Sequence, residues 1–542
     1  MPCLKTHLKT GCVLESLAPL LIAGLVFVVY LNSFSGPFIF DDFIMVHDNR
    51  SIRCLWPLTT PLSPPHEGGT HGRPVVNLSY AINYAFGGLD ARGYHAGNLF
   101  LHILVALVLY GVVRRTLAGE RFRATYGYHA TGLAMTAALI WSVHPLTTGS
   151  VSYIAARSEI LMSLFYVLTL YCVIRGVDSP RGKNWTVAAV VACALGMASK
   201  EVMVSAPLIV LLYDRIFLAG SFREALRRRW GLYVGLAATW AVLMALLAGI
   251  AFNVKRGGGA PFTVWEYART QSEVIMQYLR LSLWPRPLVL DYYDWTVAHL
   301  SLALVASLVV VLGLLTATVE AVLSRRPIGF LGACFFLILA PTSSFLPLLG
   351  EVATERRMYL PLATVVVLVV IVVWKALEAV TSRWMPAIFA GLVVAILGAF
   401  TVQRNEDYRS GLAIWSDTAA KRPNNARALT ETVTALVELG RFPEAIGYFE
   451  RATRIQPDYA MAYSNWGVAL AMQGRLDEAI GKLLEAVQRN PASAFARFNL
   501  GLVLEKQGHP QQAAIQYQSA LQIDPYFTKA RDGLVRLHQL RG

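Results

Sequence analysis

The chain has 542 residues, of which 55% are hydrophobic and only 15% are charged. Soluble domains carry about 25% charged residues, so this composition excludes an ordinary soluble protein and predicts that most of the chain contacts lipid. The net charge of +14 does not indicate nucleic-acid binding, because the arginines lie in short runs beside apolar segments and form no basic stripe with interleaved aromatic residues.

Eleven apolar segments are long enough to predict membrane-spanning helices, which need about 20 apolar residues each. They lie near residues 14–34, 97–117, 128–146, 150–175, 184–199, 202–220, 231–252, 299–322, 328–348, 357–377 and 385–402. The first is too long for the core of a signal peptide, so it is interpreted as a retained span. A further stretch, 272–289, carries Arg280, Arg286 and two prolines, and it is interpreted as an interfacial or re-entrant helix. Residues 1–403 are therefore predicted to form an all-α, polytopic membrane bundle.

The basic residues predict how these spans are oriented, because cytoplasmic loops are rich in Lys and Arg. With the N-terminus inside, every basic cluster falls on the cytoplasmic side. The clusters are Arg114, Arg115, Arg121 and Arg123; Arg175, Arg181 and Lys183; Arg215, Arg223, Arg227, Arg228 and Arg229; and Arg325 and Arg326. An odd number of spans then places the chain after residue 403 outside, in the bacterial periplasm or in the lumen of the endoplasmic reticulum.

Ionisable residues with no evident role in topology collect on the predicted outer face. Asp41 and Asp42 follow the first span, and residues 77–86 beyond them are typical of a short amphipathic helix lying on the membrane. The other candidates on this face are His95, His144, Arg157, Glu159, Lys200, Glu201, Glu355, Arg356 and Arg357, with Tyr94 and Tyr359 beside them. Charge close to the hydrocarbon is unfavourable and usually functional. Structural alternatives stay open, with the aspartates and His144 as helix caps, Lys200 with Glu201 as an interfacial ion pair, and the tyrosines as interfacial aromatic residues.

This mixture of charges suits the transfer of a sugar from a lipid phosphate. The leaving phosphate needs cations to hold its charge, which Arg and Lys provide, and it needs no strong acid. Arg356 and Arg357 are the best candidates, because they lie outside, against the trend for basic residues. The acceptor hydroxyl loses its proton as it attacks the anomeric carbon, and one positioned carboxylate suffices as the base. A single displacement of this kind inverts the anomeric centre.

Several motifs of other enzyme classes are absent from the sequence. It contains no GxxxxGK[ST] loop, so an ATP-driven transporter is not predicted, and it has neither an HExxH zinc motif nor a GxSxG elbow. The two outer aspartates are adjacent and do not form an Asp-x-Asp pair. A divalent metal is therefore possible but not favoured.

A 34-residue period marks the end of the chain. Prolines and glycines recur at this interval, at Pro423, Pro457, Pro491 and Pro525 and at Gly440, Gly474 and Gly508. The period predicts tetratricopeptide repeats, helix–turn–helix units that stack into an α-solenoid. In a second domain, residues 404–542, a short polar connection (404–422) precedes repeats at 424–457, 458–491 and 492–525 and a capping helix at 526–540. Asn465, Arg497 and Asn499 are predicted to line a groove for an extended peptide, with docking or self-association as the alternative role of the array.

Six segments occur in an order that resembles a known family. They are FDDFIMVHD (40–48), GRPVVNLSYAINYAFGG (72–88), YHAGNLFLHILVALVLY (94–110), HPLTTGSVSYIAARSEILMSLFYVL (144–168), ASKEVMVSAPLIVLLYD (198–214) and ERRMYLPLA (355–363). With the repeats, they resemble the transmembrane-and-tetratricopeptide-repeat O-mannosyltransferases and their bacterial relatives, of the GT-C class of glycosyltransferases. The resemblance covers nearly the whole chain, although eukaryotic members usually carry a longer repeat array.

The resemblance implies a polyprenyl- or dolichyl-phosphate sugar as donor, a protein acceptor on the outer face and no required cofactor. It places the catalytic carboxylate at Asp41 or Asp42, with Asp41 favoured. The donor phosphate would then be bound by Lys200, Arg356, Arg357 and Arg157. The sugar and acceptor pocket would be lined by His95, His144, Glu159, Glu201, Glu355 and Tyr359.

The predicted function is the transfer of a sugar, with mannose favoured, from the lipid phosphate to a Ser or Thr hydroxyl, with inversion. The expected partners are the lipid-linked sugar, an acceptor protein or peptide and membrane lipids, with no nucleic acid. Two alternatives remain: a non-catalytic membrane scaffold whose repeats assemble partners, and a GT-C transferase that acts on lipid or polysaccharide.

Overall fold

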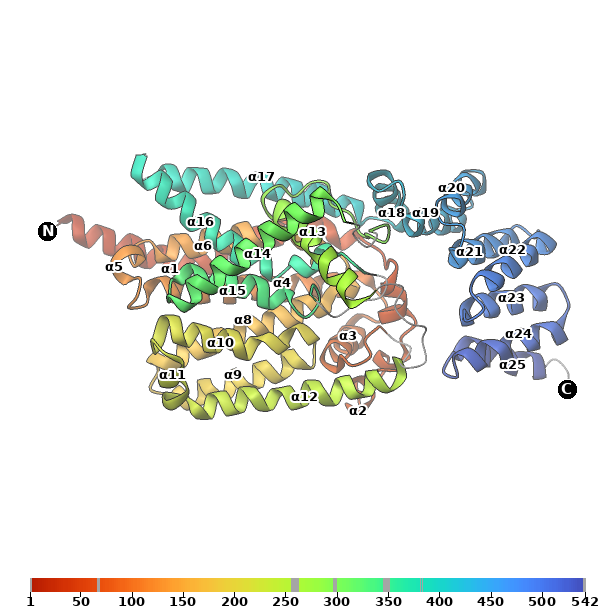
Figure 1. Cartoon of the computed structure of the whole chain (residues 1–542), viewed down its shortest axis with the longest axis horizontal. Helices are drawn as coiled ribbons and strands as arrows, with labels where there is room; N and C mark the ends of the chain where they lie inside the picture. Colours follow the sequence, from red (N-terminus) through yellow and green to blue (C-terminus); the bar gives the residue numbers. More distant parts are fainter. Residues whose placement is uncertain are drawn as a thin grey trace. The chain divides into compact units, whose positions relative to one another are not determined.

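The computed structural model describes residues 2–65, 69–254, 263–295, 300–344, 351–380, 382 and 384–539, and the regular structure of these residues is helical (Figure 1). The chain divides into two compact units. The first is Met1–Leu288 with Val297–Arg409, and the second is Val289–Thr296 with Ser410–Gly542. The sequence places the boundary after residue 403, whereas helix α17 continues to Asp407 and the second unit also includes a segment from the middle of the chain.

Each of the eleven segments predicted to span the membrane contains a helix of the first unit. These helices are α1 (Pro2–Val29), α4 (Ala91–Ala118), α6 (Ala130–Ser142), α8 (Arg157–Asp178), α9 (Gly182–Met197), α10 (Ala206–Tyr213), α12 (Trp230–Val254), α14 (Leu302–Leu323), α15 (Pro327–Leu339), α16 (Pro361–Val380) and α17 (Met385–Asp407). In Figure 1, α8, α9, α10 and α12 run side by side, and α4 packs on α1, α6 and α8. The predicted all-α membrane bundle is thereby confirmed.

Judged by the length and composition of its described helices, the structure has fewer candidate membrane spans than the eleven that the sequence predicts. Among the described residues, six helices are long and apolar enough to cross a membrane, or seven if the bent pair Glu201–Leu218 with Phe222–Arg228 is one span. The difference comes from short helices. For example, α6 and α15 have 13 residues each, a length of about 20 Å against a hydrocarbon core of about 30 Å.

The remaining α-helices of the first unit lie in its loops. They are α2 (Thr59–Leu62), α3 (Pro74–Gly87), α5 (Arg123–Tyr126), α7 (Thr148–Val151), α11 (Phe222–Arg228) and α13 (Val264–Leu283). The predicted amphipathic helix at 77–86 lies within α3. The predicted interfacial stretch at 272–289 begins earlier, as α13, because Thr263 and Glu266 form a capping box ahead of it.

The basic clusters of three inner loops meet at one end of the first unit. Arg121 donates to the carbonyls of Ile216 and Arg325, at 2.9 and 2.5 Å. Arg215 donates to the carbonyls of Val322 and Leu323, at 2.7 and 3.2 Å, and so caps the C-terminus of α14. The contacts bring together loops that are predicted to share the cytoplasmic side.

The second unit is the predicted α-solenoid. Its helices are α18 (Gly411–Lys421), α19 (Ala426–Glu438), α20 (Phe442–Ile455), α21 (Ala460–Met472), α22 (Leu476–Arg489), α23 (Ala494–Lys506), α24 (Pro510–Ile523) and α25 (Thr528–Gln539). Each of the three repeats is a pair, beginning with α19–α20, and α25 is the capping helix (Figure 1). Gly440, Gly474 and Gly508 have φ of 70°, 79° and 90°, which explains why glycine recurs where the first helix of each pair ends. The predicted polar connection at 404–422 is mostly helical, since α17 ends and α18 lies within it.

A segment between α13 and α14 in sequence completes the start of this solenoid. Asp291 accepts hydrogen bonds from Arg427 and Asn425, both at 3.0 Å, and Asp294 pairs with Arg422 at 2.6 Å. The ring of Tyr293 lies 4.1 Å from the Arg427 guanidinium. Residues 289–296 therefore belong to the second unit through ion pairs that the 34-residue period does not indicate.

The second and third repeats each have a glycine at the same position, Gly467 and Gly501, where two helices approach closely. A Cβ atom at Gly501 would lie 2.7 Å from the buried ring of Tyr517, and one at Gly467 would lie 2.6 Å from Leu483. Gly501→Ala is therefore expected to destabilise the second unit by about 1–3 kcal/mol through overpacking. The change is measured by unfolding the full chain in urea and monitoring the unfolding by limited proteolysis. Gly447→Ala is the matched control, because a Cβ there meets nothing within 4 Å; equal effects of the two substitutions would contradict the packing argument.

Candidate functional site

The first outer loop is packed onto the helices behind it. Val46 and Ile52 of this loop are fully buried in a cluster with Val76, Ile154 and Leu161. The loop is thus held against α3 and the start of α8, and its side chains are fixed in place. This packing positions the two predicted catalytic aspartates.

Asp42 anchors the loop. Its side chain is completely buried, and its two carboxylate oxygens accept hydrogen bonds from the main-chain N–H groups of Ile39 at 2.9 Å and Ala155 at 2.6 Å. Burial raises the pKa of the Asp42 carboxyl well above its usual value, against these two N–H groups, which favour the ionised form. Asp42 therefore joins the first outer loop to the segment before α8.

Asp41 is only half-buried and belongs to a different set of contacts. Its Oδ2 accepts a hydrogen bond from the hydroxyl of Tyr153 at 2.7 Å, and its main-chain N–H donates to the same hydroxyl at 3.1 Å. Tyr153 is buried and holds the carboxylate in one orientation. The sequence did not single out this tyrosine, although it lies within the segment that carries Arg157 and Glu159.

Arg356 lies next to this pair. Its guanidinium is 6.0 Å from the centre of the Tyr153 ring, and it donates to the carboxylate of Glu351. Burial alone would lower the pKa of Arg356, but the negative charges of Glu351, Asp41 and Glu159, with Tyr153, raise it above the usual value. Asp41 and Arg356, which the sequence assigns to the same predicted face, therefore lie close together. The sequence did not single out Glu351 as a site residue. The only indication of its role was its position in the same short segment as Arg356.

Glu351 is kept ionised by the cations around it. Burial would raise its pKa, yet Arg356, Arg357 and Lys200 hold the pKa of Glu351 below its usual value. A carboxyl whose pKa is lowered on folding stabilises the folded state at pH values above its unfolded pKa. This stabilisation is lost as the pH falls through the folded pKa. The ion pair with Arg356 is therefore formed at neutral pH.

Lys200 and Glu159 form a buried ion pair between α8 and the turn after α9. Their side chains are 9% and 3% exposed. We call Asp41, Tyr153, Arg356, Glu351, Glu159 and Lys200 the outer-loop cluster. It unites acidic and basic groups from four segments that lie far apart in the sequence.

Breaking this buried pair has a predictable effect on stability. Lys200→Met leaves the carboxylate of Glu159 buried without its cation, so the first unit is expected to lose about 3–5 kcal/mol. Thermal unfolding in detergent measures the loss, and adding Glu159→Leu to the same chain is expected to restore most of it. Arg409→Met removes one partner of an exposed pair with Glu406 and serves as the control; a loss as large in this control would contradict the role of burial.

Arg157 has structural partners, which do not favour its predicted contact with the donor phosphate. The guanidinium is buried, and all three of its nitrogens donate within the protein. The acceptors are Asn98 at 2.6 Å, Asn83 at 2.5 Å and the carbonyl of Tyr94 at 2.9 Å. One face also lies 4.6 Å from the ring of Tyr80. These contacts fasten α3 and α4 to α8.

Arg357 and Tyr359 have protein partners of their own. Arg357 donates to the carbonyls of Val352 at 3.1 Å and Glu351 at 2.6 Å, so it shapes the loop instead of holding a phosphate. Tyr359 is fully buried, and its hydroxyl bonds His102 at 2.6 Å. The predicted roles of Arg357 in phosphate binding and of Tyr359 in the sugar pocket stay predictions.

The two predicted pocket histidines have structural partners. Nδ1 of His144 accepts from the main-chain N–H of Leu146 at 3.2 Å, and its Nε2 lies 3.2 Å from the carbonyl of Ser282. His144 is therefore the polar helix cap that the sequence left open as an alternative. His95 lies with Nε2 3.0 Å from the carbonyl of Gly36 and ties α4 to the chain after α1.

Two glutamates complete the predicted set. Glu201 pairs with Arg73 at 3.5 Å near the surface, not with its neighbour Lys200. Glu355 is buried in the first turn of the 355–358 helix. Among the residues that the structure describes, no group of three or more His, Cys, Asp and Glu side chains could hold a metal ion.

The predicted peptide groove of the solenoid is used differently. Asn465 donates to the hydroxyl of Thr434, and Asn499 donates to the hydroxyl of Ser464, both at 3.1 Å. These bonds join the first helices of successive repeats, so the asparagines stabilise the stack. Arg497 donates to the carbonyl of Pro491 at 3.2 Å. The recurrence of asparagine at one repeat position thus has a structural cause.

Comparison with known proteins agrees with this architecture. A family described as dolichyl-phosphate-mannose-protein mannosyltransferase matches residues 74–248, and the tetratricopeptide repeat family matches 402–460, 430–494 and 464–526. The protein O-mannosyl-transferase TMTC3 of Homo sapiens is 24% identical over 486 residues, which cover 81% of this chain and 51% of the human protein. The family matches and these relatives support a TMTC-like family.

A second TMTC-like relative, the protein O-mannosyl-transferase Tmtc3 of Drosophila melanogaster, is 26% identical over 506 residues, or 80% of this chain and 54% of its own length. The chain thus spans about half the length of the curated relatives that it matches. Among solved structures, the crystal structure of MamA covers 27% of this chain and 84% of its own, with 23% identity and a TM-score of 0.23. The match to the mannosyltransferase family contains Tyr153, Glu159 and Lys200 of the outer-loop cluster.

Proposed function

We propose that this TMTC-like chain is a membrane glycosyltransferase that transfers a sugar, with mannose favoured, from a polyprenyl or dolichyl phosphate to a Ser or Thr hydroxyl of a protein. The observation that carries the proposal is the outer-loop cluster, in which a half-exposed carboxylate, held by a tyrosine, lies beside a partly buried arginine. The names of the relatives and of the mannosyltransferase family support the same reaction class.

In this reaction Asp41 is the general base. The acceptor oxygen attacks the anomeric carbon, its proton passes to the Asp41 carboxylate, and the bond between the anomeric carbon and the phosphate oxygen breaks. One displacement inverts the anomeric centre and releases the lipid phosphate. The hydrogen bond from Tyr153 fixes the orientation of the base. Positioning of this kind contributes to the rate, because the carboxylate must lie within hydrogen-bonding distance of the acceptor hydroxyl.

Arg356 and Lys200 are the proposed ligands of the donor phosphate. Each is balanced by a carboxylate, Glu351 and Glu159 respectively, which makes a buried cation tolerable before the donor arrives. Arginine carries five N–H donors in a planar fork that suits phosphate oxygens. Because these two side chains can balance the phosphate charge, we propose that no divalent metal is required, so that EDTA leaves the rate unchanged.

The proposed site faces the non-cytoplasmic side of the membrane. The basic loops gathered around Arg121 and Arg215 support a cytoplasmic location for that end of the first unit, and the first outer loop follows the C-terminus of α1. In a bacterium the repeats would then lie in the periplasm, and in a eukaryote in the lumen of the endoplasmic reticulum. The acceptor would be a protein that has crossed the membrane.

The full chain in lipid nanodiscs, supplied with polyprenyl-phosphate mannose and a Ser/Thr-rich peptide, tests the proposal directly. Mannosylated peptide with an anomeric configuration opposite to that of the donor is the expected product. Release of free lipid phosphate without peptide product would point to another acceptor, such as a lipid or polysaccharide. Absence of both products with well-folded protein would leave the scaffold alternative and overturn the proposal.

A further inference from the structure

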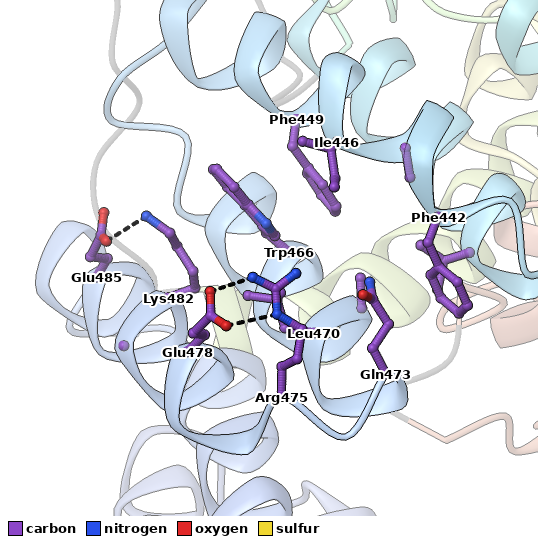
Figure 2. A pocket seen from close by; sticks show the side chains of 14 residues that line it. Phe442, Ile446, Phe449, Trp466, Leu470, Gln473, Arg475, Glu478, Lys482 and Glu485 are labelled. Atoms are coloured by element: carbon purple, nitrogen blue, oxygen red, sulfur yellow. Dashed lines mark hydrogen bonds and ion pairs between the residues drawn. The ribbon is translucent and has the colours of Figure 1, made fainter.

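A pocket of about 280 Å³ opens in the second unit between α20 and α22, the second helices of consecutive repeats (Figure 2). Phe442, Ile446 and Phe449 line it from α20, and Trp466 and Leu470 line it from α21. Phe449 stacks on Trp466, with ring centroids 5.4 Å apart and an angle of 7° between the planes. Ile446 remains 38% exposed, so apolar surface faces solvent at this point.

Charged side chains form the rim of the pocket and neutralise one another. Lys482 pairs with Glu485 at 2.8 Å, and its Nζ lies 4.6 Å from the centre of the Trp466 ring. Arg475 donates to both carboxylate oxygens of Glu478, at 2.7 and 2.5 Å (Figure 2). Two cations and two anions leave no net charge. A rim without net charge does not attract a phosphate or a strongly acidic segment as a cationic surface would, which favours an uncharged occupant.

The repeat fold does not require this lining. One period further along the chain, 34 residues on, aliphatic and uncharged residues take the same places. Leu483 and Leu500 replace Phe449 and Trp466, and Gln512, Gln516 and Ser519 replace Glu478, Lys482 and Glu485. Both sets of positions belong to the same solenoid, so the aromatic floor and the charged rim are a special feature of the first set.

The size and chemistry of the pocket select its occupant. Pockets for whole small-molecule ligands have about 300–1,000 Å³, so a pocket at or below that limit suits a single side chain. An apolar floor that contains aromatic residues, inside a polar rim, is the usual anatomy of a binding hot spot. We propose that this pocket binds one large apolar side chain of an extended polypeptide segment. The inference rests on the proposed function only in naming that segment as part of the acceptor.

Fluorescence anisotropy with the full chain in nanodiscs tests the proposal without any transfer. The probes are a short fluorescein-labelled peptide of Ser, Gly and Thr with one central phenylalanine and the same peptide with alanine there. The phenylalanine peptide is expected to bind about tenfold more tightly, which reflects burial of the ring. In Ile446→Asp, which places a charge in the pocket, the two peptides are expected to bind equally.

Ile515→Asp is the matched control, because Ile515 is 57% exposed on α24, outside the pocket lining. The tenfold preference is expected to persist there. A second variant, Trp466→Leu with Phe449→Leu, gives the first cleft the residues of the next one and is expected to abolish the preference. Equal binding of the two peptides by the unmodified chain, or a preference that survives in both pocket variants, would overturn the proposal.

Two further readouts separate the alternatives. If Ile446→Asp changes the oligomeric state in mass photometry and leaves peptide binding unchanged, the pocket holds a second copy of the chain and the proposal fails. Peptide preference without any sugar transfer would support the pocket and count against the proposed function alone. The two proposals can therefore fail independently.

Discussion

Asp41→Asn is expected to lower sugar transfer by about 10²–10⁴-fold, the usual contribution of a general base. Asparagine has nearly the shape of aspartate and can still accept the hydrogen bond from Tyr153, so the outer-loop cluster is expected to keep its structure. It cannot accept the proton of the attacking hydroxyl. Initial rates of peptide mannosylation, measured with folded protein in nanodiscs, report the loss. The donor KM is expected to change little, because Arg356 and Lys200 remain.

Asp42→Asn is the control for this prediction, because its carboxylate has a structural position. An amide at residue 42 presents one acceptor oxygen where two main-chain N–H groups, those of Ile39 and Ala155, need one each. The unmatched donor is expected to reduce stability by about 1–3 kcal/mol. Asp41→Asn with an unchanged rate would refute the assignment of the base. The assignment would also be refuted if only Asp42→Asn lost the rate and the thermal unfolding of that variant were unchanged.

The repeats and the spans could be predicted because both depend on patterns that are local in sequence. The 34-residue interval reflects glycines with positive φ, which recur in all three repeats, and close helix packing at Gly467 and Gly501, which the second and third repeats share. Apolar runs identify the helices of the first unit, since burial in lipid requires them whatever the neighbours are. Their lengths were less predictable, because short elements such as the four-residue α7 interrupt the runs.

The candidate site was predicted in its components but not in its contacts. The predicted topology assigned Asp41 and Arg356 to the same side of the membrane, and the two lie close together in the structure, yet the sequence also offered Arg157 as a phosphate ligand. Both are arginines near acidic residues, and only the fold shows that Arg157 is surrounded by acceptors from α3 and α4. Tyr153 was missed because a tyrosine in an apolar segment has many structural uses. Its role depends on a hydrogen bond across 112 residues of sequence.

Arg356 and Arg357 are adjacent, which provides a sharp second test of the site. Arg356→Gln is expected to lower transfer by about 10²–10³-fold, as for removal of one group that stabilises charge in a transition state. The reason is that its guanidinium lies beside Tyr153 and within the field of Asp41, where the phosphate charge would develop. Arg356→Lys is expected to recover only part of the rate, because lysine keeps the charge without the planar fork.

Arg357→Lys separates this effect from damage to the loop. Arg357 donates to the carbonyls of Glu351 and Val352, so its replacement is expected to lower stability and to leave the rate per folded molecule close to that of the unmodified chain. Donor KM, kcat and thermal unfolding are measured for each variant. If both arginines give the same loss of rate with the same loss of stability, the 351–357 loop is a structural support only. The cation that balances the leaving phosphate must then be sought at Lys200.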